Sequence, residues 1–151
     1  MTTSVVHDTF VIERRYDTPR ARVYAAWAKP EAKATWFGGS ADDYELDFQI
    51  GGRELNRGSA PDGTVYTYDA RYQDIAPDER IVFTYFMLMG DTRISVSVAT
   101  VEFEDDGDDG TRLVYTEQGA FLDGHDDPRE REQGTGGLLD ALAQHLGESA
   151  G

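Results

Sequence analysis

Apolar and polar residues alternate with a period of two through most of the middle of the chain, which is typical of half-buried β-strands. Short segments rich in Gly, Pro and Asp separate the alternating runs and predict tight turns between antiparallel strands. One run changes phase part-way, so we predict a β-bulge near Ala99. Seven strands are expected, at residues 10–16, 44–48, 53–59, 64–75, 80–87, 93–104 and 111–119.

Two short helices are predicted between the first and second strands. Thr18 is a good N-cap residue, and Pro19 suits the first helical position because its missing N–H would have no intrahelical partner. Pro30 ends this helix early, and residues 31–36 then restart as a second helix that carries Trp36. Few small folds begin with a strand and two short helices, so this order of elements is informative about the fold.

A long helix is predicted near the end of the chain. Asp127, Pro128 and Glu130 form a capping box with Pro at the first helical position, and Gly147 marks the end. Four leucines repeat at helical spacing on one face, and burying each of them should contribute about 1.5–3 kcal/mol. They are Leu138, Leu139, Leu142 and Leu146. Such a stripe has to pack on the sheet.

These elements predict an α+β fold in which a single curved antiparallel sheet of seven strands surrounds the long C-terminal helix. A long helix laid across a strongly curved sheet cannot fill its concave face completely. A pocket lined by aromatic and aliphatic side chains is therefore expected. The 151 residues should form one domain, 1–151, with an ordered core at about 9–147.

The composition limits the possible partners and compartments. A net charge of −15 would repel nucleic-acid phosphates and anionic membranes, so neither is an expected partner. We interpret the acidity as a solvated surface rather than as a dock for a basic partner. The absence of cysteine excludes disulfides and thiolate chemistry. No signal peptide and no apolar run of membrane-spanning length are visible, so a soluble, cytoplasmic protein is expected.

Several short motifs occur in a specific order along the chain. They are Asp17-Thr18-Pro19, Trp36-Phe37-Gly38, Gly51-Gly52-Arg53, the run 76–83 and Gly110-Thr111-Arg112-Leu113. In this order they resemble the START-like SRPBCC superfamily, in the branch named after the activator of heat-shock protein 90 ATPase, over residues 9–147. The resemblance implies an α+β helix-grip fold around a cavity for small hydrophobic molecules. The superfamily includes lipid binders, polyketide cyclases and co-chaperone domains, so the fold does not fix the function.

Two positions depart from the pattern of this family. Lys29 stands where an acidic residue usually precedes Pro-Glu, and Thr135 stands where an aromatic residue often follows the helix glycine. Because Gly134, Gly136 and Gly137 flank Thr135, no bulky side chain projects from this turn. Either the sheet approaches the helix closely here, or space is left for a ligand.

Most groups that could carry chemistry show no arrangement that indicates catalysis or metal binding. His7, His125 and His145 have no spacing typical of a ligand set or an acid–base pair. The acidic run 105–110 lacks the glutamate that a calcium loop of the EF-hand type needs, so it is interpreted as a hairpin turn. No serine has the context of a nucleophile elbow. We predict no catalytic residue, no metal site and no cofactor.

Glu117 is the polar residue that we single out. The alternation of Leu113, Tyr115 and Glu117 places the carboxylate on the inward face of the last strand. Such a group needs an Arg or a Tyr hydroxyl as a partner, and it could hold the polar end of a ligand. In the competing interpretation, which base rates favour, Glu117 lies near the strand end and reaches solvent.

The sequence therefore predicts a non-catalytic protein that binds a small hydrophobic or amphipathic molecule between the sheet and the helix at 128–146. One alternative is an enzyme similar to polyketide cyclases or dehydratases, and another is a co-chaperone-like module that binds a protein and activates an ATPase. Either a monomer or a homodimer is compatible with the sequence. The residues expected to line the cavity and bind the ligand are Trp36, Tyr68, Phe83, Tyr85, Tyr115, Glu117, Phe121, Leu138 and Leu142.

Overall fold

The computed structural model describes residues 3–38 and 42–148, which form one antiparallel sheet and three helices. The strands are β1 (Val5–Tyr16), β2 (Asp43–Leu46), β3 (Arg53–Ser59), β4 (Val65–Ala76), β5 (Arg80–Met89), β6 (Thr92–Asp106) and β7 (Gly110–Leu122). The helices are α1 (Arg20–Ala28), α2 (Pro30–Trp36) and α3 (Pro128–His145). The order of strands in the sheet is β1-β7-β6-β5-β4-β3-β2, so the first strand of the chain pairs with the last.

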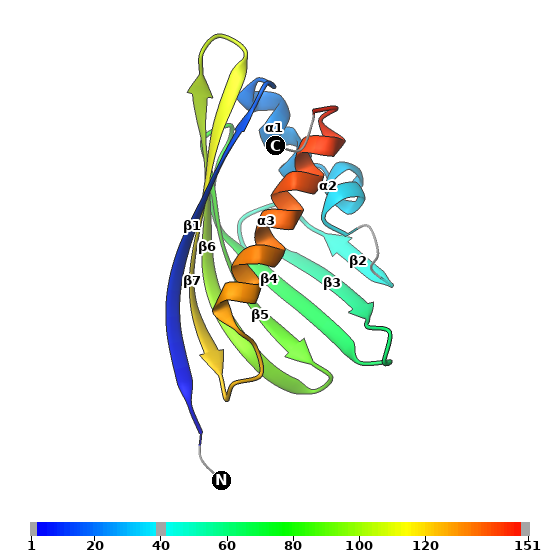
Figure 1. The fold of residues 1–151 in the computed structure, drawn as a ribbon. Helices are drawn as coiled ribbons and strands as arrows, with labels where there is room; N and C mark the ends of the chain where they lie inside the picture. Colours follow the sequence, from blue (N-terminus) through cyan, green and yellow to red (C-terminus); the bar gives the residue numbers. More distant parts are fainter. Residues whose placement is uncertain (1–2, 39–41, 149–151) are drawn as a thin grey trace.

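The sheet curves around α3, which lies across its concave face, while α1 and α2 pack near the C-terminal end of α3 (Figure 1). The hydroxyl of Tyr16 at the end of β1 donates a hydrogen bond to the carbonyl oxygen of Leu139 at 2.9 Å and ties α3 to the sheet. This arrangement confirms the predicted α+β helix-grip fold with two short helices after the first strand.

The predicted strands agree with the observed ones within a few residues, except at the start of β1. This strand begins at Val5 rather than near Phe10 because it pairs with β7 all the way to Leu122. The pairing partner therefore extends the strand into a segment whose own sequence alternates poorly. Tertiary pairing overrides local propensity at this edge of the sheet.

The predicted bulge near Ala99 is wrong. β6 pairs with β5 and with β7 in unbroken register through this residue. The irregularity lies nearer the start of β6, where Met87 pairs with Ser95, Leu88 pairs with Arg93, and Ile94 is the extra residue. The phase of the alternation therefore changes five residues earlier than the pattern of apolar residues indicated.

The earlier phase change decides which side chains of β6 point inward. Ser95 and Ser97 are buried on the concave side, whereas Val96 and Val98 lie on the outer face and are 45% and 39% exposed. A pattern based on hydrophobicity alone assigns the valines to the interior. The serines face inward because their hydroxyls meet buried polar partners: Ser97 donates to Glu117, and Ser95 accepts from Arg131.

The N-terminus of α1 also differs from the prediction. Pro19 is the N-cap residue, and its carbonyl oxygen accepts bonds from the N–H groups of Arg22 and Val23. Thr18 is buried and does not cap the helix; its hydroxyl instead donates to a carboxylate oxygen of Glu148, beyond the end of α3. A long-range partner has replaced the local capping bond that the sequence favours.

The ends of α3 agree with the prediction. The Asp127 carboxylate accepts a hydrogen bond from the N–H of Arg129 at 2.9 Å, and Pro128 is the first helical residue. Gly147 follows the helix with φ +82°, a conformation in which glycine costs little. Leu139, Leu142 and Leu146 are buried in the core, as expected for the predicted stripe.

The hydrophobic core fills the space between the three helices and the concave face of the sheet. Aromatic rings dominate it near α1 and α2, where Trp27 and Trp36 pack edge to face with ring centroids 4.8 Å apart. The indole N–H of Trp36 donates to the carbonyl oxygen of Ala26 at 2.9 Å, which fixes α2 against α1. No helix within the described ranges has both the length and the apolar composition needed to cross a membrane.

Candidate functional site

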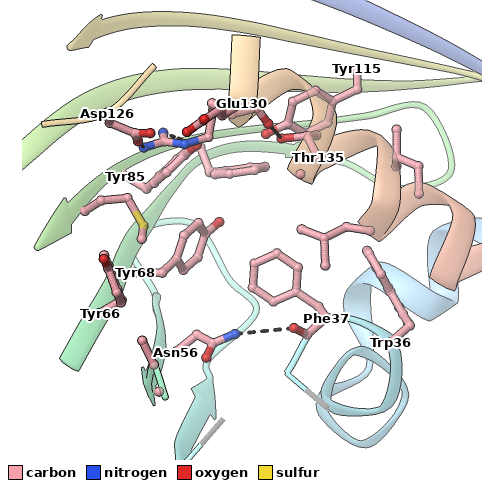
Figure 2. A pocket seen from close by; sticks show the side chains of 18 of the residues that line it. Trp36, Phe37, Asn56, Tyr66, Tyr68, Tyr85, Tyr115, Asp126, Glu130 and Thr135 are labelled. Atoms are coloured by element: carbon pink, nitrogen blue, oxygen red, sulfur yellow. Dashed lines mark hydrogen bonds and ion pairs between the residues drawn. The ribbon is translucent and has the colours of Figure 1, made fainter. Parts of the chain in front are cut away.

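A cavity of about 540 Å³ opens between α3 and the concave face of the sheet, with α2 closing one side. Figure 2 shows aromatic side chains lining it, with polar groups from α3 at one end. Of the nine residues predicted from the sequence, the structure places six in its lining: Trp36, Tyr68, Phe83, Tyr85, Tyr115 and Leu138. The sheet contributes four of them and the helices two, so the cavity depends on the curvature of the sheet over α3.

The other three predicted residues lie outside the lining. Leu142 is fully buried in the solid core one turn beyond the cavity. Phe121 packs under the guanidinium group of Arg131, with 5.2 Å between the ring centroid and the guanidinium carbon. Glu117 lies behind the wall formed by Tyr85 and Tyr115.

Glu117 is 1% exposed, so the interpretation that it reaches solvent is wrong. One carboxylate oxygen accepts hydrogen bonds from the Tyr85 hydroxyl at 2.7 Å and from the Ser97 hydroxyl at 2.9 Å. The other oxygen accepts from the Tyr115 hydroxyl at 2.9 Å. The tyrosine hydroxyls that the sequence analysis required as partners are therefore present, and the carboxylate is satisfied inside the protein.

Arg131 of α3 supplies the positive charge of this group, although it was not among the residues predicted from the sequence. One of its terminal nitrogens lies 3.4 Å from a Glu117 oxygen and donates to the Tyr85 hydroxyl at 2.9 Å. The other donates to the Ser95 hydroxyl at 2.9 Å and to the Asp126 carboxylate. The available signal was the spacing of Arg131 from Leu138, seven residues apart on α3, which places both on the side that faces the sheet.

Burial in this network changes the acidity of the tyrosines. Desolvation raises the pKa of Tyr85 well above its usual value of 10, and the neighbouring Glu117 carboxylate adds to the shift. Desolvation and Glu117 likewise raise the pKa of Tyr115. Both hydroxyls therefore keep their protons at neutral pH and donate them to Glu117, so they act as hydrogen-bond donors rather than as bases.

A second buried ion pair, also missed, lies on the other side of the cavity wall. The Lys33 ammonium of α2 is 2.7 Å from a carboxylate oxygen of Glu54 on β3, and each side chain is at most 1% exposed. The hydroxyls of Tyr44 and Tyr72 donate to Glu54 at 2.5 and 3.0 Å. Burial lowers the pKa of Lys33, and the Glu54 carboxylate opposes that shift.

Aromatic rings enclose the Lys33 ammonium. Its nitrogen lies 4.5 Å from the centroid of Phe37 and 5.1 Å from that of Trp27, and both residues line the cavity. Lys33 itself does not reach the cavity. The pair therefore holds α2, and with it Phe37, in place against β3. The spacing of Lys33 three and four residues before Trp36 and Phe37 was the signal that it faces inward.

Residues 17–147 match the family described as activator of Hsp90 ATPase homolog 1-like protein. The chain belongs to this family. It is 47% identical to a solved protein from Rhizobium leguminosarum, covering 97% of this chain and 98% of that one with a TM-score of 0.93. It is 48% identical to protein Mll3558 from Rhizobium loti, covering 94% and 99% with a TM-score of 0.89.

The fold extends to more distant proteins. CalU16 from Micromonospora echinospora is 19% identical, covering 97% of this chain and 85% of that one with a TM-score of 0.62. At that identity the likeness shows the fold alone. No curated protein matches the chain in sequence.

The glycine-rich turn of α3 is where this member of the family leaves room at the cavity. A Cβ atom added at Gly134 would meet nothing within 4 Å, and Gly134 lines the cavity. The Thr135 hydroxyl donates to the carbonyl oxygen of Arg131 at 2.9 Å. Of the two explanations for these glycines, the structure favours open space at Gly134. Gly136 differs, because its Cβ would meet the Arg14 guanidinium at 3.2 Å.

Gly119 of β7 should be intolerant of substitution because it faces the Glu117 network. A Cβ there would lie 2.9 Å from the Ser97 hydroxyl oxygen and 2.9 Å from the ring of Phe121, both held by their surroundings. We expect Gly119→Ala to lower the free energy of unfolding by about 1–3 kcal/mol, measured by urea denaturation.

Gly137→Ala is the matched control for that substitution. Its Cβ would meet nothing within 4 Å and it lies inside α3, so the change should stabilise the protein by about 1 kcal/mol. If Gly119→Ala were as stable as the unsubstituted protein, the close packing around Ser97 would be wrong.

Proposed function

We propose that the protein binds a small hydrophobic or amphipathic molecule in the cavity between α3 and the sheet. The observation that carries the proposal is the open cavity of about 540 Å³ with a lining rich in aromatic side chains. This volume falls within the range of about 300–1,000 Å³ that is typical of small-molecule sites. Expelling water from apolar walls of this kind stabilises a bound apolar molecule by about 25 cal/mol per Å² that becomes buried.

Contacts among the aromatic side chains that line the cavity hold them in fixed positions. Phe37 and Tyr68 contact each other at 64° with ring centroids 5.0 Å apart, and Tyr68 also packs on Tyr85 at 4.6 Å. Tyr85 is in turn fixed by its bonds to Glu117 and Arg131. Because these contacts hold the rings in place, little conformational entropy would be lost when a ligand enters.

The polar network supports binding more strongly than catalysis. Glu117 does not line the cavity, and its oxygens already accept three hydroxyl hydrogen bonds. The raised pKa values of Tyr85 and Tyr115 leave both hydroxyls protonated. An acid–base enzyme would instead need a titratable group that is open to the substrate and changes charge near neutral pH. Glu117 is better suited to fix Arg131 and the two tyrosines.

Gly134→Phe should close the cavity. A benzyl group attached at this open position on the cavity side of α3 would occupy the space next to Thr135 and Leu138. We expect the variant to lose uptake of bound molecules while keeping its stability, since glycine is a poor helix former. The measurement is native mass spectrometry with solvent extraction, followed by thermal shifts against aromatic compounds and fatty acids.

Gly137→Phe is the control, because Gly137 lies on the same helix with equally open space and does not line the cavity. It should bind as the unsubstituted protein does. If neither the unsubstituted protein nor the control bound any of these compounds, the proposal would be wrong. A search for a protein partner would then follow.

A further inference from the structure

Unpartnered polar atoms concentrate at the cavity. Of the buried side-chain nitrogens and oxygens in the described residues, two have no hydrogen-bond partner: the Tyr68 hydroxyl and the Trp27 indole N–H. Both residues line the cavity. A buried donor without a partner is costly, and native proteins keep few of them. Because both residues line the cavity, a molecule bound there is a candidate partner for each of the two atoms.

The Tyr68 hydroxyl is positioned to meet a ligand. The Tyr68 ring lies in the cavity wall between Phe37 and Tyr85 (Figure 2), and its hydroxyl oxygen is buried beside the cavity without a partner in the protein. Desolvation raises the pKa of Tyr68 well above 10, and the Glu54 carboxylate adds to this shift. The hydroxyl therefore carries its proton and offers a hydrogen bond to an acceptor.

Other polar groups around the aromatic part of the cavity are already engaged. The hydroxyls of Tyr85 and Tyr115 donate to Glu117, and that of Thr135 donates to the Arg131 carbonyl oxygen. The Trp36 indole donates to Ala26. The Trp27 indole N–H can only donate, so it needs an acceptor, and the protonated Tyr68 hydroxyl can donate to an acceptor as well.

The charge balance argues against an anionic ligand. Arg131 is the basic residue among the described lining residues, and its guanidinium is paired with Glu117 and Asp126. Glu130 adds a further carboxylate to the lining. One positive charge thus faces three negative ones, and a carboxylate or phosphate entering the cavity would find no free cation.

Building on the proposed function, we infer that the cavity selects an uncharged, aromatic molecule with a carbonyl-type acceptor, and that the Tyr68 hydroxyl is the donor that recognises it. The aromatic part would pack against Phe37 and Tyr85. Tyr68 is therefore a specificity-determining residue, and carboxylates with the same ring system bind poorly.

Two fluorescent naphthalenes that share one ring system test this inference. Prodan carries an uncharged ketone, and dimethylaminonaphthoate carries a carboxylate in its place. With the full chain at pH 8, we expect the ketone to bind at least about tenfold more tightly than the carboxylate, because the carboxylate would lose its hydration without a partner. The measurement is a fluorescence titration with each probe.

Tyr68→Phe removes only the hydroxyl. We expect prodan to bind this variant about 3- to 10-fold more weakly, the loss of one hydrogen bond, with a blue-shifted emission because its carbonyl is no longer hydrogen-bonded. Its melting temperature without ligand should be unchanged or higher, since the hydroxyl has no partner in the protein. Tyr24→Phe is the control: Tyr24 on α1 is partly buried and does not line the cavity, so this variant should bind prodan normally.

Different failures have different meanings. Equal affinity and equal emission of prodan in Tyr68→Phe would overturn the role of Tyr68. Tighter binding of the naphthoate than of the ketone would overturn the selection against anions while leaving a ligand-binding cavity in place. Absence of binding of both probes by the unsubstituted protein and by the control Gly137→Phe would count against the proposed function as well as the inference.

Discussion

Glu54→Gln is expected to lower the free energy of unfolding by about 3–5 kcal/mol, because it leaves the Lys33 ammonium without its counter-ion in a fully buried site. The shape of the side chain is kept, and the amide oxygen can still accept from Tyr72 or Tyr44. The loss therefore reports the uncompensated charge rather than a cavity. Urea denaturation at pH 7 measures it.

The instability of Glu54→Gln should depend on pH. Burial lowers the pKa of Lys33 in the folded protein below its usual 10.5, and removing Glu54 takes away the group that opposes this shift. Between the folded and unfolded pKa values the unfolded chain binds more protons, so the free energy of unfolding rises with pH. The variant should thus recover stability as the pH is raised from 7 towards 10.5.

A second substitution shows whether the charge is the cause. Lys33→Met in the Glu54→Gln background removes the unpaired ammonium and should restore most of the lost stability, so the double-mutant cycle gives a coupling of several kcal/mol. The exposed pair of Arg80 and Asp74 is the control, and Asp74→Asn should cost less than about 1 kcal/mol. A loss below about 1 kcal/mol for Glu54→Gln would contradict the buried pair.

Arg131→Met is expected to cost about 3 kcal/mol and to weaken binding in the cavity. The Arg131 side chain is 11% exposed, and its guanidinium is the positive partner of both Glu117 and Asp126. Its removal leaves the Glu117 carboxylate charged and buried, with the hydroxyls of Tyr85, Tyr115 and Ser97 as its remaining partners. Chemical denaturation and a prodan titration measure the two effects.

Substituting Glu117, the acidic partner of the pair, should lower the free energy of unfolding less than substituting Arg131. Glu117→Gln leaves Arg131 paired with Asp126, and the amide oxygen can still accept a hydroxyl hydrogen bond. We expect a loss of about 1–2 kcal/mol, and the double variant should be more stable than Arg131→Met alone. If the two single substitutions lowered the free energy of unfolding equally, Arg131 would not be the partner that stabilises the buried Glu117 carboxylate.

Most of the fold could be predicted from local patterns. The strand at 53–59 and the cap at Asp127 agree with the structure residue by residue, because alternation, turn glycines and helix caps are decided by neighbours in the sequence. The errors share one cause. Thr18 bonds to Glu148 and β1 extends along β7, so partners more than a hundred residues away replaced the local choices.

From the sequence, only the aromatic and aliphatic residues of the candidate site could be predicted. Tyr68 and Tyr85 were found because alternation places them on the inward face of their strands. Ser95 and Ser97 are buried although valines stand next to them in β6, and a hydrophobicity pattern cannot anticipate a polar interior. Arg131 and Lys33 were missed because a charged residue on a helix is ordinarily solvated.

The sequence by itself determined the order of elements, the curved sheet around α3, the apolar stripe of that helix and the inward direction of Glu117. These properties follow from period, capping and turn chemistry, which act over a few residues. Only the tertiary structure decided that Lys33 meets Glu54, that Arg131 meets Glu117, and that the Tyr68 hydroxyl is left without a partner. Burying a charge or a hydroxyl is favourable or costly according to what faces it, and in this protein the groups that face one another come from strands and helices far apart in the chain.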